Sequence, residues 1–224
     1  MVSQGAAAAA GGTRARLLAA AAAEFAARGF DGAKVDRIAV RAGVNKAMLY
    51  YHFRSKAALY REILRGTFAG VAAAVADLGT GGGAPDVRIR GFVAAVVREA
   101  ATRPHFPAIW LRELAEGGRH LDAGTIAAVR QVLETLGRIL ADGRRSGQLV
   151  AAHPLVTHIC IVAPILFFAA SGPLRERFAH LMPAALALPS LDAVAEHVVS
   201  LTLATLAPDT VAPPTPAPKR RSRR

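Results

Sequence analysis

The sequence predicts an all-α protein, and three observations agree on this fold class. Alanine dominates the composition, and apolar residues recur at the three- and four-residue spacing of an amphipathic helix almost throughout. Alternating β-branched residues, which are typical of strands, are scarce. The 224 residues exceed what one small core needs, so we expect two parts that share a continuous helical body.

The first helix is expected to begin at Thr13, a suitable N-cap, and to end near Arg28, because Gly29 follows. Residues 1–12 contain no charged side chain and therefore no basic n-region. We predict a disordered leader there rather than a signal peptide. Thr13 is also a candidate phosphate contact, although side chains at a helix start often only meet solvent.

Two short helices separated by a tight turn come next. Apolar positions predict a helix over residues 35–42, and Gly43 follows where the chain must adopt a positive φ to turn. Asn45 is a good N-cap for a second helix over residues 46–53. Two short helices joined by such a turn form a helix-turn-helix, whose second helix can lie in the major groove of DNA.

The second of these helices has an unusual exposed surface. Leu49 and Phe53 lie four residues apart and can anchor it to a core. The remaining faces hold Lys46, Ala47, Tyr50, Tyr51 and His52. Lysine and tyrosine reach phosphates or base edges, and a small alanine permits close approach to thymine methyl groups. A surface helix with half-buried aromatic rings is the alternative, but two adjacent tyrosines are hard to bury together.

Positive charge is concentrated in the same region. Residues 13–65 contain 11 Lys and Arg against 4 Asp and Glu, whereas residues 66–207 contain 12 against 11. The rest of the net charge of +12 lies in residues 208–224, a Pro-rich and then basic tail that we expect to be disordered. This split predicts a polyanionic partner for the N-terminal part, and DNA fits better than a membrane surface because no apolar face is left unused.

The segment Thr13–Leu64 resembles the TetR-type (TetR/AcrR) bacterial transcriptional regulators. The residues that carry the resemblance are Phe25, Gly29-Phe30, Ile38-Ala39, Ala42-Gly43-Val44, Leu49-Tyr50-Tyr51-His52-Phe53 and Lys56. It implies an all-helical homodimer with an N-terminal DNA-binding head and a larger ligand-sensing, dimerising body. It also implies that Lys56 contacts a phosphate. Asn45 is a further predicted DNA contact, beside Thr13, Lys56 and the exposed residues of the helix over 46–53. We place the head at residues 13–58 and the body at 59–207.

The body is expected to contain about six helices. Ser55 caps a helix from Lys56 to about Leu78, which the head and body would share. The glycine run in Gly79–Pro85 resembles a phosphate-binding loop, but no Gly-Lys-Ser/Thr follows it and no strand precedes it, so we interpret it as a connection between helices. Later helices are predicted at residues 86–102, 106–116, 122–145, 154–170, 174–180 and 191–206.

Two of these helices are candidates for a dimer interface. The helix over 154–170 is apolar nearly all round and the helix over 191–206 carries an apolar stripe, so two copies could form a four-helix interface. Such a dimer would hold two recognition helices about 34 Å apart, the spacing of a palindromic operator. The strongly apolar run of residues 159–170 is too short to span a bilayer, and we expect a soluble, cytoplasmic protein that does not insert in membranes.

The body shows no catalytic pattern, and we expect neither an enzyme nor a metal or cofactor site. His158 and Cys160 lie on different sides of their helix, and no histidine at helical spacing joins Glu113 and Glu116. A small apolar effector is a better expectation. The candidate ligand-binding residues are Phe92, Val96, Phe106, Trp110, Glu113, His158 and Phe168, some of which belong only to the core.

These observations favour a ligand-responsive homodimeric regulator that binds a palindromic operator and is released by a small hydrophobic molecule. We favour a repressor. Activation is the alternative, because the direction of regulation depends on where the operator lies. An architectural DNA-binding protein without sequence preference is one alternative, and it predicts a steep salt dependence. A helical enzyme with an undetected polar site is the other.

Overall fold

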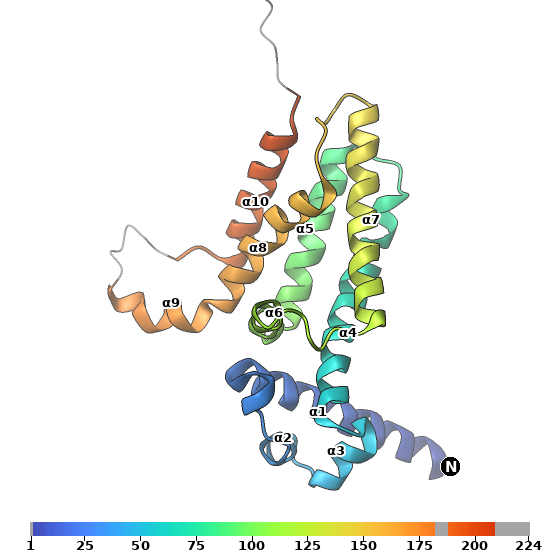
Figure 1. Ribbon diagram of the computed structural model, residues 1–224, viewed down its shortest axis with the longest axis vertical. Coiled ribbons are helices and arrows are strands. Elements are labelled where there is room, and N and C mark those ends of the chain that lie inside the picture. The colour runs from blue at the N-terminus through green and yellow to red at the C-terminus, as the bar shows by residue number, and fades with distance from the viewer. Residues whose placement is uncertain (1, 182–187, 209–224) are drawn as a thin grey trace, which may run out of the picture.

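The computed structural model describes residues 2–181 and 188–208, with side chains from Gly12 onward. Across this part of the chain, ten α-helices and two 3₁₀ helices account for the regular structure, and no strand is present. The predicted all-α class is confirmed. A small N-terminal head and a larger helical body are joined by the long helix α4, which runs from one into the other (Figure 1). The basic tail predicted over residues 208–224 lies outside the described residues, apart from its first residue.

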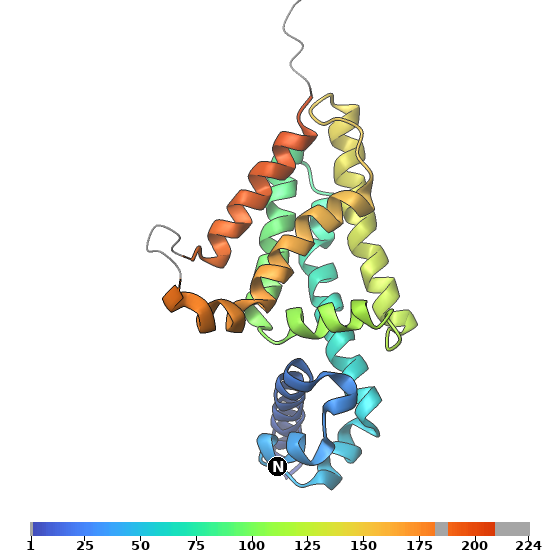
Figure 2. The same cartoon turned by 60° about the vertical axis from the view of Figure 1, so that its left-hand side comes forward.

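The head consists of α1 (Val2–Gly32), α2 (Val35–Ala42), α3 (Lys46–Phe53) and the start of α4 (Lys56–Val75). Its core is formed by one apolar side chain or more from each helix, all with no exposed surface: Leu17, Phe25, Ile38, Leu49, Leu59 and Leu64. Figure 2 shows α1, α2 and α3 gathered below the body.

The first helix begins earlier than its predicted cap. It starts at Val2 instead of at Thr13, so the segment predicted as a disordered leader forms the first turns of α1. The physical reason is that the alanine-rich segment favours helix and contains no proline to stop it. At the other end, Gly29 interrupts the helix with φ 69° and ψ 178°, where a stop was expected, and the backbone is helical again in the last turn before Gly32.

The body contains the rest of α4 and eight further elements. They are η1 (Ala76–Gly79), α5 (Pro85–Thr102), α6 (Phe106–Ala115), α7 (Ala123–Arg145), α8 (Pro154–Ala170), α9 (Gly172–Phe178), η2 (Ala179–Leu181) and α10 (Leu191–Leu206). A second apolar core joins α4, α5, α7, α8 and α10 around the fully buried residues Ile89, Phe92, Leu136, Ile139 and Ile161.

Most element bounds agree with those expected from the sequence. The bounds of α2, α3, α8 and α10 match the predicted ranges, because caps, prolines and glycines mark them clearly. The helix expected to reach Leu78 instead ends at Val75 and continues as η1. Arg88 holds this tightened end: it is buried and donates to the carbonyl oxygens of Leu78 and Gly79 while pairing with Asp142 at 2.8 Å.

Among the described residues, no single helix combines the length and apolar composition that a membrane crossing requires. Within residues 2–181 and 188–208, α8 taken together with α9 and η2 is the one combination that meets that test, across a bend of 50°.

Candidate nucleic-acid interface and body cavity

The turn between α2 and α3 is built by local backbone chemistry. Gly43 adopts φ 65° and ψ 37°, the left-handed conformation that glycine tolerates without strain. Its N–H and that of Val44 donate to the carbonyl oxygens of Val40 and Ala39, which closes α2. The side chain of Asn45 then accepts a hydrogen bond from the N–H of Met48 at 3.0 Å, which starts α3.

Helix α3 is anchored on one side and exposed on the other. Leu49 and Phe53 are buried, as the sequence indicated, and the exposed face presents Lys46, Ala47, Tyr50 and Tyr51. Tyr51 is the most open of these aromatic rings, at 77% exposed. His52 differs from its predicted position, because it is half-buried and its Nε2 has no hydrogen-bond partner among the described residues.

Two lysines in the predicted DNA-contacting set have different surroundings. Lys46 forms an exposed ion pair with Asp36 at 3.0 Å, and this hydrogen-bonded carboxylate raises the lysine pKa. Exposed pairs contribute little, so a phosphate can replace Asp36 at small cost. Lys56 points back into the head, where its ammonium donates to the carbonyl oxygens of Phe30 and Ala33 at 2.9 and 3.1 Å.

A buried carboxylate that sequence reasoning missed orients α2 on α1. Glu24 accepts from the Arg37 guanidinium at 2.6 Å and from the N–H of Lys34. Burial alone would raise the pKa of Glu24, but these hydrogen bonds and the charge of Arg37 outweigh it and leave the pKa lowered. The signal in the sequence was a lone glutamate on the apolar face of a helix. Thr13 is half-buried and its hydroxyl accepts from Arg16.

Glu113 lies at the junction of head and body instead of in a ligand cavity. Its carboxylate has no exposed surface and accepts from the Tyr60 hydroxyl at 3.1 Å and from the His120 N–H at 2.7 Å. The His120 ring nitrogen Nδ1 is 2.9 Å from the same carboxylate. Tyr60 has a raised pKa because it is buried and faces this charge. Helical spacing missed His120 because a loop, not a helix, brings it there.

The potential ligand atoms of Glu113, Glu116 and His120 lie within 4.8 Å of one another. Donors from the protein already satisfy the Glu113 carboxylate, so the cluster is explained as a structural link between α4 and the loop after α6.

A small apolar cavity of about 70 Å³ lies inside the body. Four of the seven predicted ligand-binding residues line it: Val96, Phe106, Trp110 and His158. Phe68, Thr67 and Glu99 line it as well. Sequence spacing gave no signal for these three, because it does not show which faces of α4 and α5 meet across a cavity.

Two other predicted ligand-binding residues lie elsewhere. Phe92 belongs to the fully buried core, with its ring centroid 6.2 Å from that of His158. Phe168 packs under the Arg175 guanidinium at 3.6 Å, away from the cavity lining. Both rings serve packing, because neighbouring side chains already cover the faces that a ligand would need.

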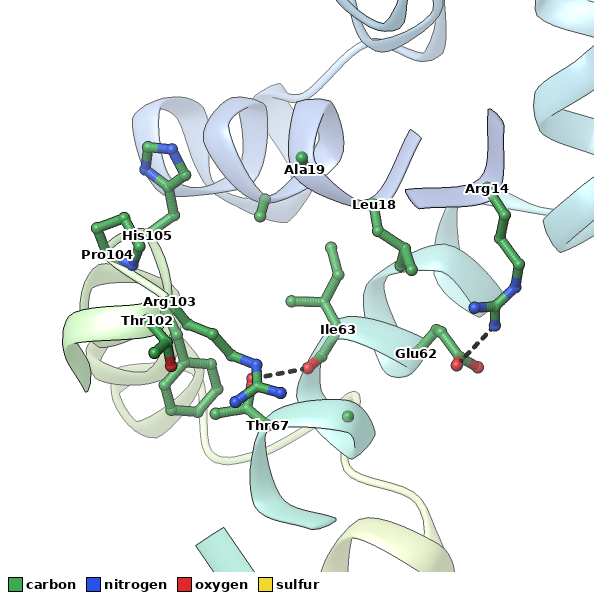
Figure 3. Close-up of a pocket in the computed structure, with 13 residues that line it drawn as sticks. Arg14, Leu18, Ala19, Glu62, Ile63, Thr67, Thr102, Arg103, Pro104 and His105 are labelled. Atoms are coloured by element: carbon green, nitrogen blue, oxygen red, sulfur yellow. Dashed lines mark hydrogen bonds and ion pairs between the residues drawn. The ribbon is translucent and has the colours of Figure 1, made fainter. Parts of the chain in front are cut away.

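A larger groove of about 570 Å³ opens between the head and the body. Figure 3 shows it bounded by α1, by α4 and by the connection from α5 to α6. Arg14 and Glu62 form an ion pair of 2.8 Å at one end, and Arg103 projects into the groove near Thr67.

One face of the body remains apolar and exposed. On α8, Leu155, Val156, Ile159 and Phe167 are each 46–67% exposed, and Leu201 on α10 is 56% exposed. The two helices pack side by side, so the exposed side chains belong to the pair of helices predicted as a dimer interface.

Known proteins match the head by sequence and most of the chain by fold. Residues 17–63 match the model of the bacterial regulatory proteins of the tetR family. The head of the chain therefore resembles the DNA-binding heads of the tetR-family regulators. Its head is 44% identical over 52 residues to the transcriptional repressor SCO4008 of Streptomyces coelicolor and 50% identical over 52 residues to the transcriptional activator FasR of Mycolicibacterium smegmatis. These alignments cover 23% of this chain and 27% and 24% of the relatives.

The chain therefore spans about a quarter of the length of these curated relatives. A tetR-family protein from Rhodococcus RHA1 shares the fold over 87% of this chain and 97% of its own, with a TM-score of 0.67 and 21% identity. The head is thus similar in sequence to named regulators, and most of the chain is similar in fold to a solved tetR-family structure.

Proposed function

We propose that the protein is a homodimeric, ligand-responsive transcriptional regulator, most simply a repressor. It binds a palindromic operator through α3 and loses operator affinity when a small molecule occupies the body. The observation that carries this proposal is the exposed face of α3, where two tyrosines, a lysine and an alanine project from a helix that Leu49 and Phe53 hold rigidly. A helix that served only packing would gain no stability from leaving the Tyr51 ring exposed to solvent.

Each DNA-contacting role follows from placement. Lys46, Ala47, Tyr50 and Tyr51 face outward and can reach bases and phosphates directly. Asn45 caps α3 and keeps its amide nitrogen available for a phosphate. Lys56 acts mainly by holding the loop after α1 in place, because its ammonium points inward, and His52 is a less direct contact because its Nε2 is buried. Thr13, at the edge of the head, is a peripheral contact.

A dimer through α8 and α10 accounts for the exposed apolar face. Large apolar side chains in contact with water are costly, and a self-complementary patch on two helices can be covered by its own copy. The substitution Val156→Asp would place a charge in that interface. We expect it to produce monomers in analytical ultracentrifugation, whereas Val87→Asp, on the equally exposed surface of α5, should leave the dimer intact.

The deciding experiment compares binding to a duplex from upstream of the protein's own gene with binding to a scrambled duplex, at two salt concentrations. We expect a preference of at least about a hundredfold for the upstream duplex, a conservative threshold because specific regulators typically reach about 10³–10⁷-fold. Tyr51→Ala and Lys46→Ala should each reduce that preference while leaving thermal stability unchanged. Arg98→Ala, an exposed change in the body, is the control for loss of positive charge.

The rival is an architectural DNA-binding protein, favoured by the basic head and tail. It requires equal affinity for both duplexes with a steep loss of binding as salt rises. That result would contradict operator recognition by α3 at this site. A preference for the upstream duplex that survives both salt concentrations would exclude the rival.

A further inference from the structure

The body cavity contains two polar groups among apolar and aromatic walls. Glu99 of α5 and His158 of α8 both line it, and the rest of the lining is almost wholly apolar apart from Thr67. Buried polar groups are normally satisfied by protein, water or ligand. The chemistry of these two groups therefore restricts which effector the cavity can take. This inference rests on the proposed function, because it concerns the effector of the same regulator.

Glu99 is paired with a positively charged side chain that a ligand could displace. Its carboxylate forms an ion pair with the guanidinium of Arg103, the C-cap residue that follows α5. The glutamate side chain is only 17% exposed, whereas that of Arg103 is 39% exposed. Arg103 can swing into water and stay solvated, but Glu99 cannot leave the cavity. A buried carboxylate without a counter-charge is strongly unfavourable, so any ligand that displaces Arg103 must bring a positive charge of its own.

His158 does not oppose a cation. Burial lowers the pKa of this imidazole, which keeps the ring neutral at neutral pH. Its Nδ1 is buried and has no hydrogen-bond partner among the described residues. A neutral imidazole with a free nitrogen can exchange a hydrogen bond with an ammonium group or with a polar atom beside it. An anionic ligand could pair with the Arg103 guanidinium only by leaving the Glu99 carboxylate beside a neutral ring without its counter-charge.

The ion pair also separates the cavity from the larger groove. Glu99 lines the cavity, Arg103 lines the groove, and Thr67 and Phe106 line both. Figure 3 shows Arg103 on the groove side of this boundary, next to Thr67. The cavity of about 70 Å³ is too small for an ordinary ligand, whereas ligand sites occupy roughly 300–1,000 Å³. Movement of Arg103 would join the two spaces and supply the missing volume.

We propose that the effector is an apolar organic cation, of the class of hydrophobic amines, whose ammonium replaces Arg103 at Glu99. Its apolar part lies among Phe68, Phe106 and Trp110, whose ring faces attract a cation as well as apolar surface. The same replacement opens the boundary to the groove beside α1, so occupation of the body alters the contact between body and head.

The test uses three probes that share one apolar group and differ in charge: 4-phenylbutylamine, 4-phenylbutanol and 4-phenylbutyrate. Trp110 is the only tryptophan in the chain and lines the cavity, so its fluorescence reports binding directly. We expect the full-length protein to bind the amine at least about tenfold more tightly than the alcohol, and the carboxylate most weakly, as a single charge contact of this kind predicts.

Two variants and two controls assign the preference to the ion pair. Glu99→Gln should abolish the preference for the amine, and Arg103→Ala should strengthen amine binding because it removes the competing cation. Glu134→Gln and Arg98→Ala alter exposed charges elsewhere in the body and should change nothing. Circular dichroism establishes that each variant is folded. If Glu99→Gln does not fold, the ranking of the three probes on the unaltered protein still decides the question.

The inference is overturned if the carboxylate binds best, if the three probes bind equally, or if the amine preference survives Glu99→Gln. Duplex binding without any probe is measured separately on the same samples. Selective duplex binding together with no amine preference would overturn only this inference. Loss of duplex selectivity would overturn the proposed function, whatever the probes do.

Discussion

Lys56 stabilises the loop between α1 and α2 through its ammonium group. The ammonium donates to two backbone carbonyl oxygens and lies 4.5 Å from the centre of the Phe30 ring. Lys56→Met keeps the alkyl chain but removes these donors. We expect the free energy of unfolding to fall by about 1.5–3 kcal/mol, the range for hydrogen bonds that involve a charge.

The measurement is urea unfolding at one protein concentration, since dimerisation would add to apparent stability. Lys34→Met is the matched control, because this side chain is exposed and its loss should change stability by less than about 0.5 kcal/mol. Equal, small effects for both lysines would show that Lys56 serves only as a DNA-contacting charge.

Asp122 predicts a dependence of stability on pH. A hydrogen bond from Arg65 lowers the pKa of this carboxyl group to about 2, against the opposing effect of burial and with help from Thr125. Because the folded pKa is depressed, the stabilisation is present above the ordinary value of 3.8 and is lost as pH falls toward about 2. Arg65 is half exposed, so we expect a contribution of no more than about 1 kcal/mol.

Asp122→Asn tests this contribution because asparagine also caps helices and so preserves the start of α7. The unaltered protein should be more stable than the variant at pH 6, and the difference should vanish near pH 2, as followed by thermal unfolding. A constant difference across that interval would contradict a role for the carboxylate charge.

At the scale of the element, α3 depends on its N-cap. Asn45→Ala removes the side-chain acceptor for the Met48 N–H and should cost about 1 kcal/mol of stability. Asn45→Asp keeps an acceptor there and should restore that stability. The same aspartate adds a negative charge at the DNA-facing end of α3. The Asn45→Asp variant should therefore bind the duplex weakly even though its stability is restored. Urea unfolding and duplex binding on both variants separate the cap from the contact.

At the scale of the whole molecule, Tyr60 connects the head to the body. Its ring packs against Phe30 and His120 with centroids 5.2 and 5.0 Å apart, and its hydroxyl bonds to Glu113. Tyr60→Phe preserves the ring but leaves a buried carboxylate oxygen with one donor fewer. We expect a loss of about 1–3 kcal/mol in urea unfolding.

Tyr51→Phe is the matched change, because it removes a hydroxyl from an exposed ring and should not affect stability. Arg119 and Asp31 add a second link between head and body at 2.7 Å, but both are exposed and contribute little. Similar stabilities for the two phenylalanine variants would show that the head and body do not depend on the Tyr60–Glu113 hydrogen bond.

The helical class, most helix bounds and the exposed face of α3 follow from the amino-acid sequence alone. These features depend on local rules: glycine accepts the positive φ of Gly43, Asn45 and Ser55 cap the following helices, and apolar spacing buries Leu49. The early start of α1 shows the limit of such rules, because a cap at Thr13 is an option for the chain and not a requirement.

The positions of the polar groups in the body depend on how the helices pack together. Glu113 and Glu99 are both glutamates on apolar helices, yet one joins the head to the body and the other faces a cavity. The difference comes from which neighbouring helix reaches each carboxylate, and that depends on packing between residues far apart in the chain, such as Tyr60 and Glu113. Sequence spacing describes one helix at a time, so it cannot distinguish the two.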